Sequence, residues 1–443
     1  MEPATSTFKN RPCNRFEQNL LLLDQAANFS FNVIARISGA LDVDILRQAL
    51  DYVQRQHYYL NVSLDLGSPP AFVVHPTLPI PVRVLTNTDR TAWQEEAERE
   101  LNTKFDLTRG PLARAVLLTR QNEADLIVTF EHLSADGMSG AHFVREVVAA
   151  CGQLAQGVRL PQASPQSVLY PDPQWFPKSV SGVRGLPKLL SFLARYGYDA
   201  LRFGKKHYPK PEWIPFERRD VRLTHYLFSR EDTERLINRC RTAQTTMQGA
   251  LSASLLLTLA SELREKANVP EPVINCVSSV NARPYCRTDI SDRHLGLWVG
   301  QVVRPYLIRP GTDFWTLARA VIGDLRRALT TDMLFVPYRL LFRRVYTDAA
   351  AFTRLFENSQ PYIEATNLGR LAFETTYGPF ELTRLHMGTG LQFTQASPWG
   401  LTIAATTFAG QLQTNFHYLA TCWDAETADR VSQAIVDRLL QAS

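Results

Sequence analysis

The sequence lacks the short motifs of the common nucleotide-binding and hydrolytic enzymes. It contains no G-x-x-x-x-G-K-[ST] phosphate-binding loop and no G-x-G-x-x-G dinucleotide motif. It also contains no G-x-S-x-G nucleophile elbow. The sequence therefore supports neither a nucleotide-binding protein nor a hydrolase with a serine nucleophile.

Cysteines are few and scattered, without a C-x-x-C pair or a close grouping with histidine. The six are Cys13, Cys151, Cys240, Cys276, Cys286 and Cys422. This spacing does not favour a zinc site. In a chain of this length we expect free, buried thiols and a reducing compartment.

Targeting and membrane-spanning segments are also missing. The first ten residues, MEPATSTFKN, have no basic start followed by an apolar core, so they do not resemble a signal peptide. The longest apolar stretches, such as LSASLLLTLA, are too short and too polar at their edges to span a bilayer. The net charge of +5 is mild, and no nucleic-acid motif accompanies it. We expect a cytoplasmic protein without a nucleic-acid partner.

The composition is that of a globular protein built from more than one unit. The 443 residues are 45% hydrophobic and 21% charged, and a chain this long exceeds one ordinary core. We predict an N-terminal lobe over residues 1–175, a linker over 176–219 and a C-terminal lobe over 220–443. The halves show the same mixture of strands and helices without a sequence repeat, which indicates a duplicated α/β architecture.

The hydrophobic periodicity predicts the main elements of both halves. Amphipathic helices are expected at 42–57, 91–105, 229–243, 245–267 and 424–442, three of them capped by Asp42, Ser229 and Asp424. Strands are expected at 29–39, 82–86, 112–120, 124–132 and 221–229. Residues 400–420 read as a hairpin around Ala409 and Gly410.

The linker differs from both halves because it is rich in proline, basic residues and aromatics. A helical piece is predicted near residues 187–204. Two interpretations stay open: an ordinary connector on the surface, or a basic amphipathic patch over 176–210 that touches lipid, a membrane surface or an acidic carrier protein.

The stretch TFEHLSADGMSG at 129–140 is the strongest functional signal. An apolar, strand-like run ends there and is followed by His132, Asp136 and Gly137. We expect a tight loop, in which Gly137 adopts backbone conformations that a side chain would forbid. A histidine there can accept a proton from an alcohol or amine near neutral pH, because its ordinary pKa is about 6.5.

The residues alone leave other interpretations of this stretch open. A single histidine at a strand end is often a structural residue with satisfied hydrogen bonds. His132 and Asp136 could also be two metal ligands, with His142 as a third, although no fourth ligand is evident.

Further segments connect this stretch to a known family. Residues 131–137 match the motif HHxxxDG, with Glu131 in place of the first histidine and His132 as the second. Further matches follow the family order: KFDLTRGPLARAVLL at 104–118, MQGALSASLLLTLA at 247–260, VNARPY at 280–285, HLGLWVG at 294–300 and ATNLGRL at 365–371. The chain therefore resembles the superfamily of condensation domains, polyketide-associated acyltransferases and alcohol acetyltransferases.

The resemblance implies a fold and a division of roles. The fold would be α/β, with two chloramphenicol-acetyltransferase-like lobes in a V-shaped pseudo-dimer and a tunnel between them. His132 would be the general base. The candidates to stabilise the oxyanion would be the Gly137 N–H and side chains from the second lobe. Asp136 would point away from the substrate and pair with Arg283, which would otherwise be an ordinary surface arginine. Trp298 would pack in the core.

Thr366, Asn367 and Gly369 would form a structural turn, and Asn367 and Gly369 would support the site through it. The resemblance implies no metal and no bound cofactor. Its co-substrate would be an acyl group carried as a thioester by coenzyme A or by phosphopantetheine.

The expected activity is direct acyl transfer from the thioester to a hydroxyl of a small or lipid-like acceptor, in natural-product or lipid biosynthesis. No carrier or adenylation domain is recognisable in the sequence, which favours a free-standing acyltransferase. A separate acyl carrier protein is a possible partner. Two alternatives stay open: a free-standing condensation enzyme that forms an amide, and a non-catalytic module of the same fold that recruits a carrier or partner.

Overall fold

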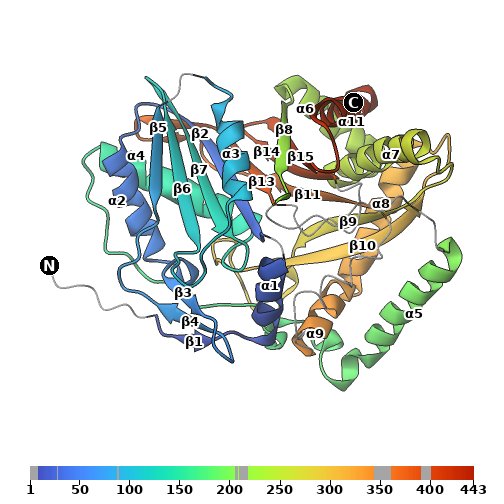
Figure 1. Cartoon of the computed structure of the whole chain (residues 1–443), viewed down its shortest axis with the longest axis horizontal. Coiled ribbons are helices and arrows are strands. Elements are labelled where there is room, and N and C mark those ends of the chain that lie inside the picture. Colours follow the sequence, from blue (N-terminus) through green and yellow to red (C-terminus); the bar gives the residue numbers. More distant parts are fainter. Residues whose placement is uncertain are drawn as a thin grey trace.

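The computed structural model describes residues 8–26, 28–86, 89–204, 208, 218–343, 361–390 and 401–443. Strands in these ranges form two six-stranded sheets and one three-stranded sheet. Each large sheet, together with its helices, makes one lobe, with the first lobe on the left of Figure 1 and the second on the right. The expected α/β fold with two similar lobes is confirmed.

The sheet of the first lobe is almost wholly antiparallel. In spatial order its strands are β12 (Thr376–Tyr377), β13 (Phe380–Thr389), β2 (Ser30–Ser38), β7 (Glu123–Glu131), β6 (Ala113–Thr119) and β5 (Val82–Thr86). Only β5 and β6 run parallel. The central strands β2 and β7 are buried on both faces, which explains the apolar run at 126–128 of β7.

Helices cover both faces of this sheet. They are α4 (Gly137–Ala155), which packs on β2 and β13, α2 (Val43–Gln54), which packs on α4, and α3 (Ala92–Asn102). The third helix also contacts β8 (Val221–Leu227) of the second lobe, where the Glu98 carboxylate accepts hydrogen bonds from the Leu223 N–H and the Arg222 guanidinium, each at 2.9 Å. This helix therefore joins the two lobes.

The second lobe repeats the arrangement with a mixed sheet. Its strands, in spatial order, are β10 (Val299–Leu307), β9 (Val273–Asn281), β11 (Tyr362–Arg370), β14 (Leu401–Phe408), β15 (Gln411–Leu419) and β8. The helices are α6 (Arg230–Thr242), α7 (Met247–Ala267), α8 (Phe314–Thr330) and α11 (Ala425–Ala442). Helix α7 contacts β9, β11 and three helices, and most of its residues are buried.

The remaining elements lie at the edges of the lobes. The small sheet consists of β1 (Arg11–Pro12), β4 (Ala71–Val74) and β3 (Val62–Asp65), and the other helices are α1 (Arg15–Ala26), α5 (Leu186–Phe203) and α9 (Val336–Arg343). The helix predicted near 187–204 is α5. Within the described ranges, no helix has both the length and the apolarity needed to cross a bilayer.

Local sequence signals placed several element ends correctly. Asp42, Ser229 and Asp424 cap α2, α6 and α11 by accepting hydrogen bonds from backbone N–H groups. Ala409 and Gly410 both have positive φ, 48° and 79°, as the two-residue turn of a twisted hairpin requires.

One long-range feature was not predicted. Strands β12 and β13 come from the second half of the sequence but belong to the sheet of the first lobe, where β13 pairs with β2. A segment of the C-terminal half therefore crosses back to complete the lobe that carries His132. The lobes predicted from the sequence, 1–175 and 220–443, assign this segment to the C-terminal lobe.

A cluster of three histidines, two of them buried and His225 partly buried, lies where β13 meets the second sheet. Asn415 bridges two of them: its Oδ1 accepts from the Nδ1–H of His225 at 2.8 Å, and its amide N–H donates to Nδ1 of His386 at 2.9 Å. The two rings stack with centroids 4.8 Å apart. Nearby, His417 Nε2 accepts from the Thr389 N–H at 3.2 Å. Burial lowers the pKa of His225 and of His417 to about 4, and that of His386 well below its usual value.

These histidines predict an acid-sensitive contact between the lobes. Between pH 6.5 and about 4, the unfolded chain binds a proton at His225 that the folded protein does not bind. The free energy of unfolding should therefore fall as the pH falls through this window, by about 3 kcal/mol for this histidine alone. Urea midpoints measured from pH 7.5 to 4.5 would show the decrease.

A pair of variants tests this assignment. His225→Gln is expected to reduce the pH dependence, because Gln does not titrate, whereas His386 and His417 still do. The matched change His75→Gln removes a partly exposed histidine that bonds Ser63, and it controls for the loss of an imidazole elsewhere in the chain. Equal slopes for wild type and His225→Gln would contradict the assignment.

Candidate active site

The motif lies at a strand–turn–helix junction of the first lobe. Strand β7 ends at Glu131, residues 132–135 form the turn, and α4 begins at Gly137. Asp136 caps the helix: its Oδ1 accepts from the Ser139 N–H at 3.0 Å, and the Asp136 N–H donates to Ser139 Oγ at 3.1 Å. This reciprocal capping box fixes the end of the turn.

The expected loop conformation of Gly137 is wrong. Gly137 is the first residue of α4 and is absent from the positions with positive φ. The reason for glycine is steric: a Cβ here would come within 2.9 Å of Met387 Sδ and 3.0 Å of Leu368 Cδ2. Gly137 thus lets β13 and β11 approach the start of α4.

His132 is held by its ring and by its backbone. Its Nδ1 lies 2.8 Å from the Ala135 carbonyl oxygen, and its N–H donates to the Phe29 carbonyl oxygen at 2.8 Å. The ring stacks on Phe29 at a centroid distance of 4.6 Å and meets Phe31 at 4.8 Å. Because a carbonyl oxygen can only accept, Nδ1 carries the proton and Nε2 has the lone pair.

The electrostatics favour a neutral imidazole. Burial lowers the pKa of His132, while the hydrogen bond to the Ala135 carbonyl and the charge of Asp136 act in the opposite direction. The side chain is nevertheless partly accessible to solvent. A neutral, partly accessible imidazole with its lone pair on Nε2 can accept a proton.

Asp136 is fully buried and faces the second half of the chain. Its Oδ2 accepts from Arg283 Nη1 at 2.7 Å and from the Trp298 N–H at 3.0 Å. These bonds, with that from Ser139, use both carboxylate oxygens. They outweigh burial, so the pKa of Asp136 is lower than usual.

The predicted pair of Asp136 and Arg283 is thus formed, and both side chains are 1% exposed. Arg283 lies in the 3₁₀ turn η6 (Arg283–Tyr285), directly after β9, and its Nη2 donates to the His294 carbonyl oxygen at 2.7 Å. Trp298 packs in the core, as expected. The pair links the motif to the strand ends of the second lobe.

The predicted turn at 366–369 is a bulge within a strand. Strand β11 shifts register between Asn367 and Arg370, and Gly369 has a φ of 73°. The Asn367 Oδ1 accepts from the Gly369 N–H at 2.8 Å, which holds the bulge. Leu368 between them reaches the Gly137 backbone. Among the described residues, neither Asn367 nor Gly369 forms a hydrogen bond with His132.

Glu131, which replaces the first histidine of the motif, is buried in an acidic environment. Burial and the neighbouring Asp24 raise the pKa of Glu131 well above its usual range. Its Oε1 accepts a long bond from the Leu133 N–H at 3.4 Å, and Oε2 has no partner within the described residues. Burial thus favours the neutral, protonated form of Glu131 over the carboxylate.

Sequence reasoning missed the aromatic side chains around the imidazole. Phe29 and Phe31 lie on either side of the start of β2, which pairs with the end of β7 with Ser30 opposite Glu131. Their alternate spacing predicted only a strand. The strand register, which the sequence does not reveal, brings both rings to His132.

The metal interpretation gains no geometric support in the part of the chain that the structure describes. No group of three or more histidine, cysteine or acidic side chains is close enough to hold an ion there. His142 instead packs its ring against Phe373 at a centroid distance of 4.8 Å. All six cysteines are free thiols.

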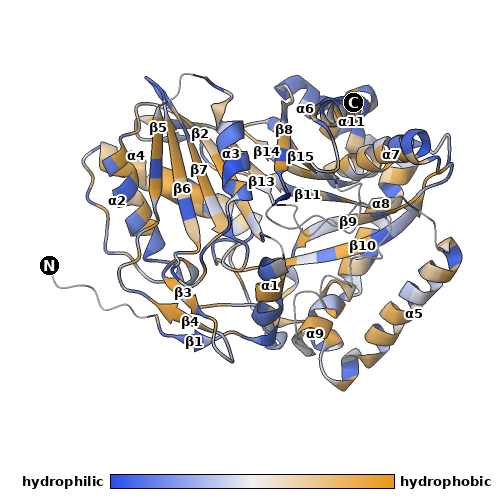
Figure 2. Ribbon diagram, viewed as in Figure 1, coloured by the Kyte–Doolittle hydropathy of each residue, from blue (hydrophilic) through white to orange (hydrophobic). Residues whose placement is uncertain are grey.

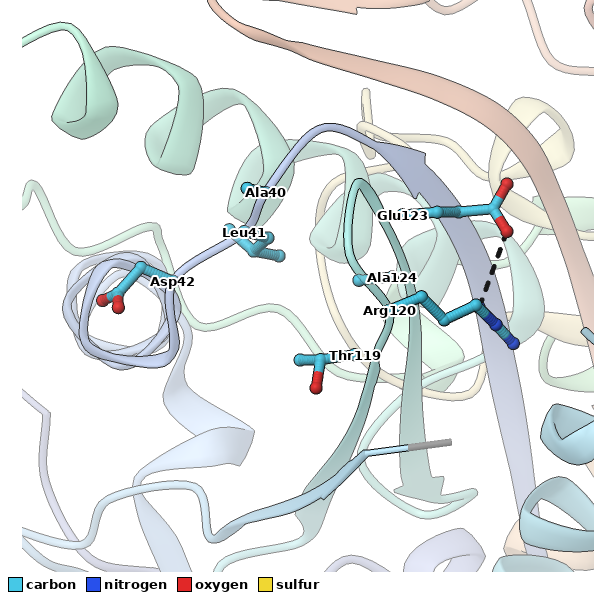
Figure 3. A pocket seen from close by; sticks show the side chains of 7 residues that line it. All are labelled: Ala40, Leu41, Asp42, Thr119, Arg120, Glu123 and Ala124. Atoms are coloured by element: carbon cyan, nitrogen blue, oxygen red, sulfur yellow. Dashed lines mark ion pairs between the residues drawn. The ribbon is translucent and has the colours of Figure 1, made fainter. Parts of the chain in front are cut away.

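A surface cavity of about 290 Å³ lies away from the motif (Figure 3). It is lined by residues of the β6–β7 hairpin and of the loop before α2: Ala40, Leu41, Asp42, Thr119, Arg120, Glu123 and Ala124. The hairpin end of the nine-residue β7 is about 26 Å from its motif end. This cavity is therefore not part of the His132 site.

Comparison with protein families matches both halves of the chain. Residues 18–172 match the condensation domain, and residues 217–417 match the phthiocerol/phthiodiolone dimycocerosyl transferase C-terminus. The first match includes the motif, and the second includes Arg283 and the bulge of β11.

Curated relatives match mainly one part of the chain. Chondramide synthase of Chondromyces crocatus is 33% identical over 167 residues, which are 35% of this chain and 4% of that protein. A linear gramicidin synthase from Brevibacillus parabrevis is 27% identical over 179 residues, 38% of this chain and 4% of that protein. The chain spans only a small fraction of these relatives.

Solved structures share the fold over nearly the whole chain. Polyketide synthase associated protein 5 from Mycobacterium tuberculosis superposes with a TM-score of 0.66 at 19% identity, covering 97% of both chains. Trichothecene 15-O-acetyltransferase from Fusarium sporotrichioides gives 0.71 at 13% identity, covering 100% of this chain and 99% of the other. With the family matches on both halves, the chain belongs to the superfamily of condensation domains and polyketide-associated acyltransferases.

Proposed function

We propose that the protein transfers an acyl group from a thioester donor to a hydroxyl group of an acceptor, with His132 as the general base. The fixed orientation of the imidazole carries this proposal. The Nδ1–H bond to the Ala135 carbonyl, at 2.8 Å, leaves the lone pair on Nε2, and the lowered pKa keeps it available at neutral pH.

The proposed reaction is direct. Nε2 of His132 accepts the hydroxyl proton while the hydroxyl oxygen bonds to the thioester carbonyl carbon. When the tetrahedral intermediate collapses, the carbon–sulfur bond breaks and the thiolate takes the proton back from Nε2. An ester and a free thiol result, and no acyl-enzyme forms. Holding both substrates together would supply much of the rate.

The Gly137 N–H is the proposed donor to the oxyanion. As the first N–H of α4 it has no partner within the helix, and no described residue accepts from it. The positive end of the helix also favours a developing negative charge. We propose that the two substrates reach this point from opposite sides, through a tunnel between the lobes.

Three comparisons bear on the acceptor. The match of residues 217–417 to a dimycocerosyl transferase, and the likeness to a protein described as an O-acetyltransferase, support a hydroxyl. The match of residues 18–172 to the condensation domain favours the second candidate, amide formation on an amine. The donor is proposed to be acyl-CoA or an acyl group on a phosphopantetheine carrier, with no cofactor bound to the protein itself.

Thiol release by the purified protein tests the proposal. Wild type is given acyl-CoA and acyl-pantetheine donors of several chain lengths, each with alcohols, with amines, or with neither. We expect release that depends on an alcohol, and an ester in the product mass spectrum. Release that depends only on amines would establish the amide-forming alternative. No release with any donor, including acylated carrier proteins, would favour the non-catalytic recruitment module.

A further inference from the structure

Helix α5, in the predicted linker, lies on the outside of the second lobe. It projects at the lower right of Figure 1, beside α9, and its Asp199 pairs with Arg304 of β10, the edge strand of the second sheet. It is 18 residues long, and none of its residues is fully buried. Figure 2 shows apolar residues along its whole length. A helix held at the surface would ordinarily turn such residues toward the protein.

The inward side of α5 is largely polar and ion-paired. Lys188 Nζ lies 2.9 Å from Asp332 Oδ2, and Asp199 Oδ2 lies 2.8 Å from Arg304 Nη1. Arg195 adds a longer pair with Asp324, at 3.7 Å. Of the apolar residues, Leu189 and Phe192 pack against the core of the protein. The helix is therefore attached mainly through charges.

The outward side of α5 is an apolar stripe. Leu190, Leu193 and Leu201 are 65%, 51% and 87% exposed, and with Leu186 they follow the three- and four-residue spacing of one helix face. Tyr196 and Tyr198 flank the stripe on either side and are also exposed. This orientation is the reverse of an ordinary surface helix, so the stripe is suited to an external apolar partner.

The described segment that carries the stripe is basic. Residues 176–204 contain five lysines and arginines but a single acidic residue, Asp199. Asp199 forms its ion pair with Arg304, on the side of the helix that faces the protein. Arg184 and Arg202 are exposed and have no carboxylate partner in the described part of the chain. The surface beside the leucines thus attracts negative charge.

We propose that α5 is a docking helix for an anionic lipid bilayer, with its leucines in the headgroup–acyl boundary and the tyrosines and basic residues at headgroup level. A leucine stripe flanked by aromatics and basic side chains is the composition of helices that lie in this interface. The helix is about 27 Å long, and the stripe extends along all of it. Because the helix projects from the protein, a bilayer with negative headgroups can cover the whole stripe.

Vesicle co-sedimentation of the full chain tests the proposal. Wild type is expected to bind vesicles that contain phosphatidylglycerol, to bind pure phosphatidylcholine less, and to dissociate at high salt. The variant Leu190→Ser/Leu193→Ser/Leu201→Ser should lower the partition coefficient about 10-fold or more, because it removes most of the apolar contact.

A matched variant controls for losing exposed apolar surface in general. Leu66→Ser/Val84→Ser/Val158→Ser changes three first-lobe residues of 40–50% exposure and should bind vesicles like wild type. Melting temperatures would show that both variants are folded. The proposal is overturned if wild type does not bind anionic vesicles, or if the α5 variant binds them unchanged.

Two other partners for the stripe give distinct results, and each would overturn the proposal. A second copy of the chain would appear as a dimer that the α5 variant abolishes without any vesicle effect. A carrier protein would bind wild type but not the variant in the absence of lipid. The vesicle measurement needs no substrate, so its outcome is independent of the acyl-transfer proposal.

Discussion

Replacing His132 with alanine is expected to lower the rate of acyl transfer by about 10²- to 10⁴-fold, while the protein stays folded. Nε2 is the proposed acceptor of the substrate proton, and alanine offers nothing in its place. The ring is partly accessible, and its main contacts are Phe29 and Phe31, so its loss should cost little stability. Initial rates of thiol release with the best donor and acceptor would measure the effect.

His142 provides a matched control on the same segment. It is also a partly buried histidine, ten residues along in α4, but its ring packs on Phe373. His142→Ala should keep a rate within a few-fold of wild type. Similar losses in both variants, or near-normal activity in His132→Ala, would refute the assignment.

The pH dependence of the rate gives a second, independent readout. The pKa of His132 is below its ordinary value of 6.5, so protonation should reduce the rate only at pH values under 6.5. A rate that still rises between pH 7.5 and 9 would require a different base.

The sequence predicted those features that depend on neighbouring residues. Asp42, Ser229 and Asp424 are capping residues followed by apolar periodicity, and each caps the helix it precedes. The position of the motif after a buried strand was also local information. The pairing of Asp136 with Arg283 was expected only because the family resemblance connected two segments 147 positions apart.

Features set by contacts between distant segments could not be predicted in this way. Strand β13 has no local property that assigns it to the first lobe, because its partner β2 lies more than 300 residues earlier. The reason for Gly137 depends on Met387 and Leu368, which reach it from β13 and β11. A glycine after an aspartate predicted a loop, whereas the tertiary contact required a helix start without a side chain.

Replacing Asp136 with alanine is expected to lower the free energy of unfolding by about 3–5 kcal/mol, because it leaves the buried Arg283 guanidinium without its partner. It also removes the cap of α4. The urea midpoint should fall strongly, and activity should fall with it, because the turn that holds His132 loses its attachment to the second lobe.

The pair of Asp51 and Arg55 is a close control, since its nitrogen–oxygen distance is also 2.7 Å. Its side chains are 51% and 55% exposed, so Asp51→Ala should change the free energy of unfolding by less than about 1 kcal/mol. The contrast would show that burial, and not the distance alone, makes the Asp136 pair important.

The two site variants separate chemistry from architecture. His132→Ala should lose activity at a normal urea midpoint, whereas Asp136→Ala should lose both together. The double variant Asp136→Ala/Arg283→Ala should be less destabilised than the sum of the single changes, because no charge is left buried alone. If Asp136→Ala kept a normal midpoint, the carboxylate would not anchor the turn, and an activity loss at that midpoint would instead place Asp136 in the chemical step.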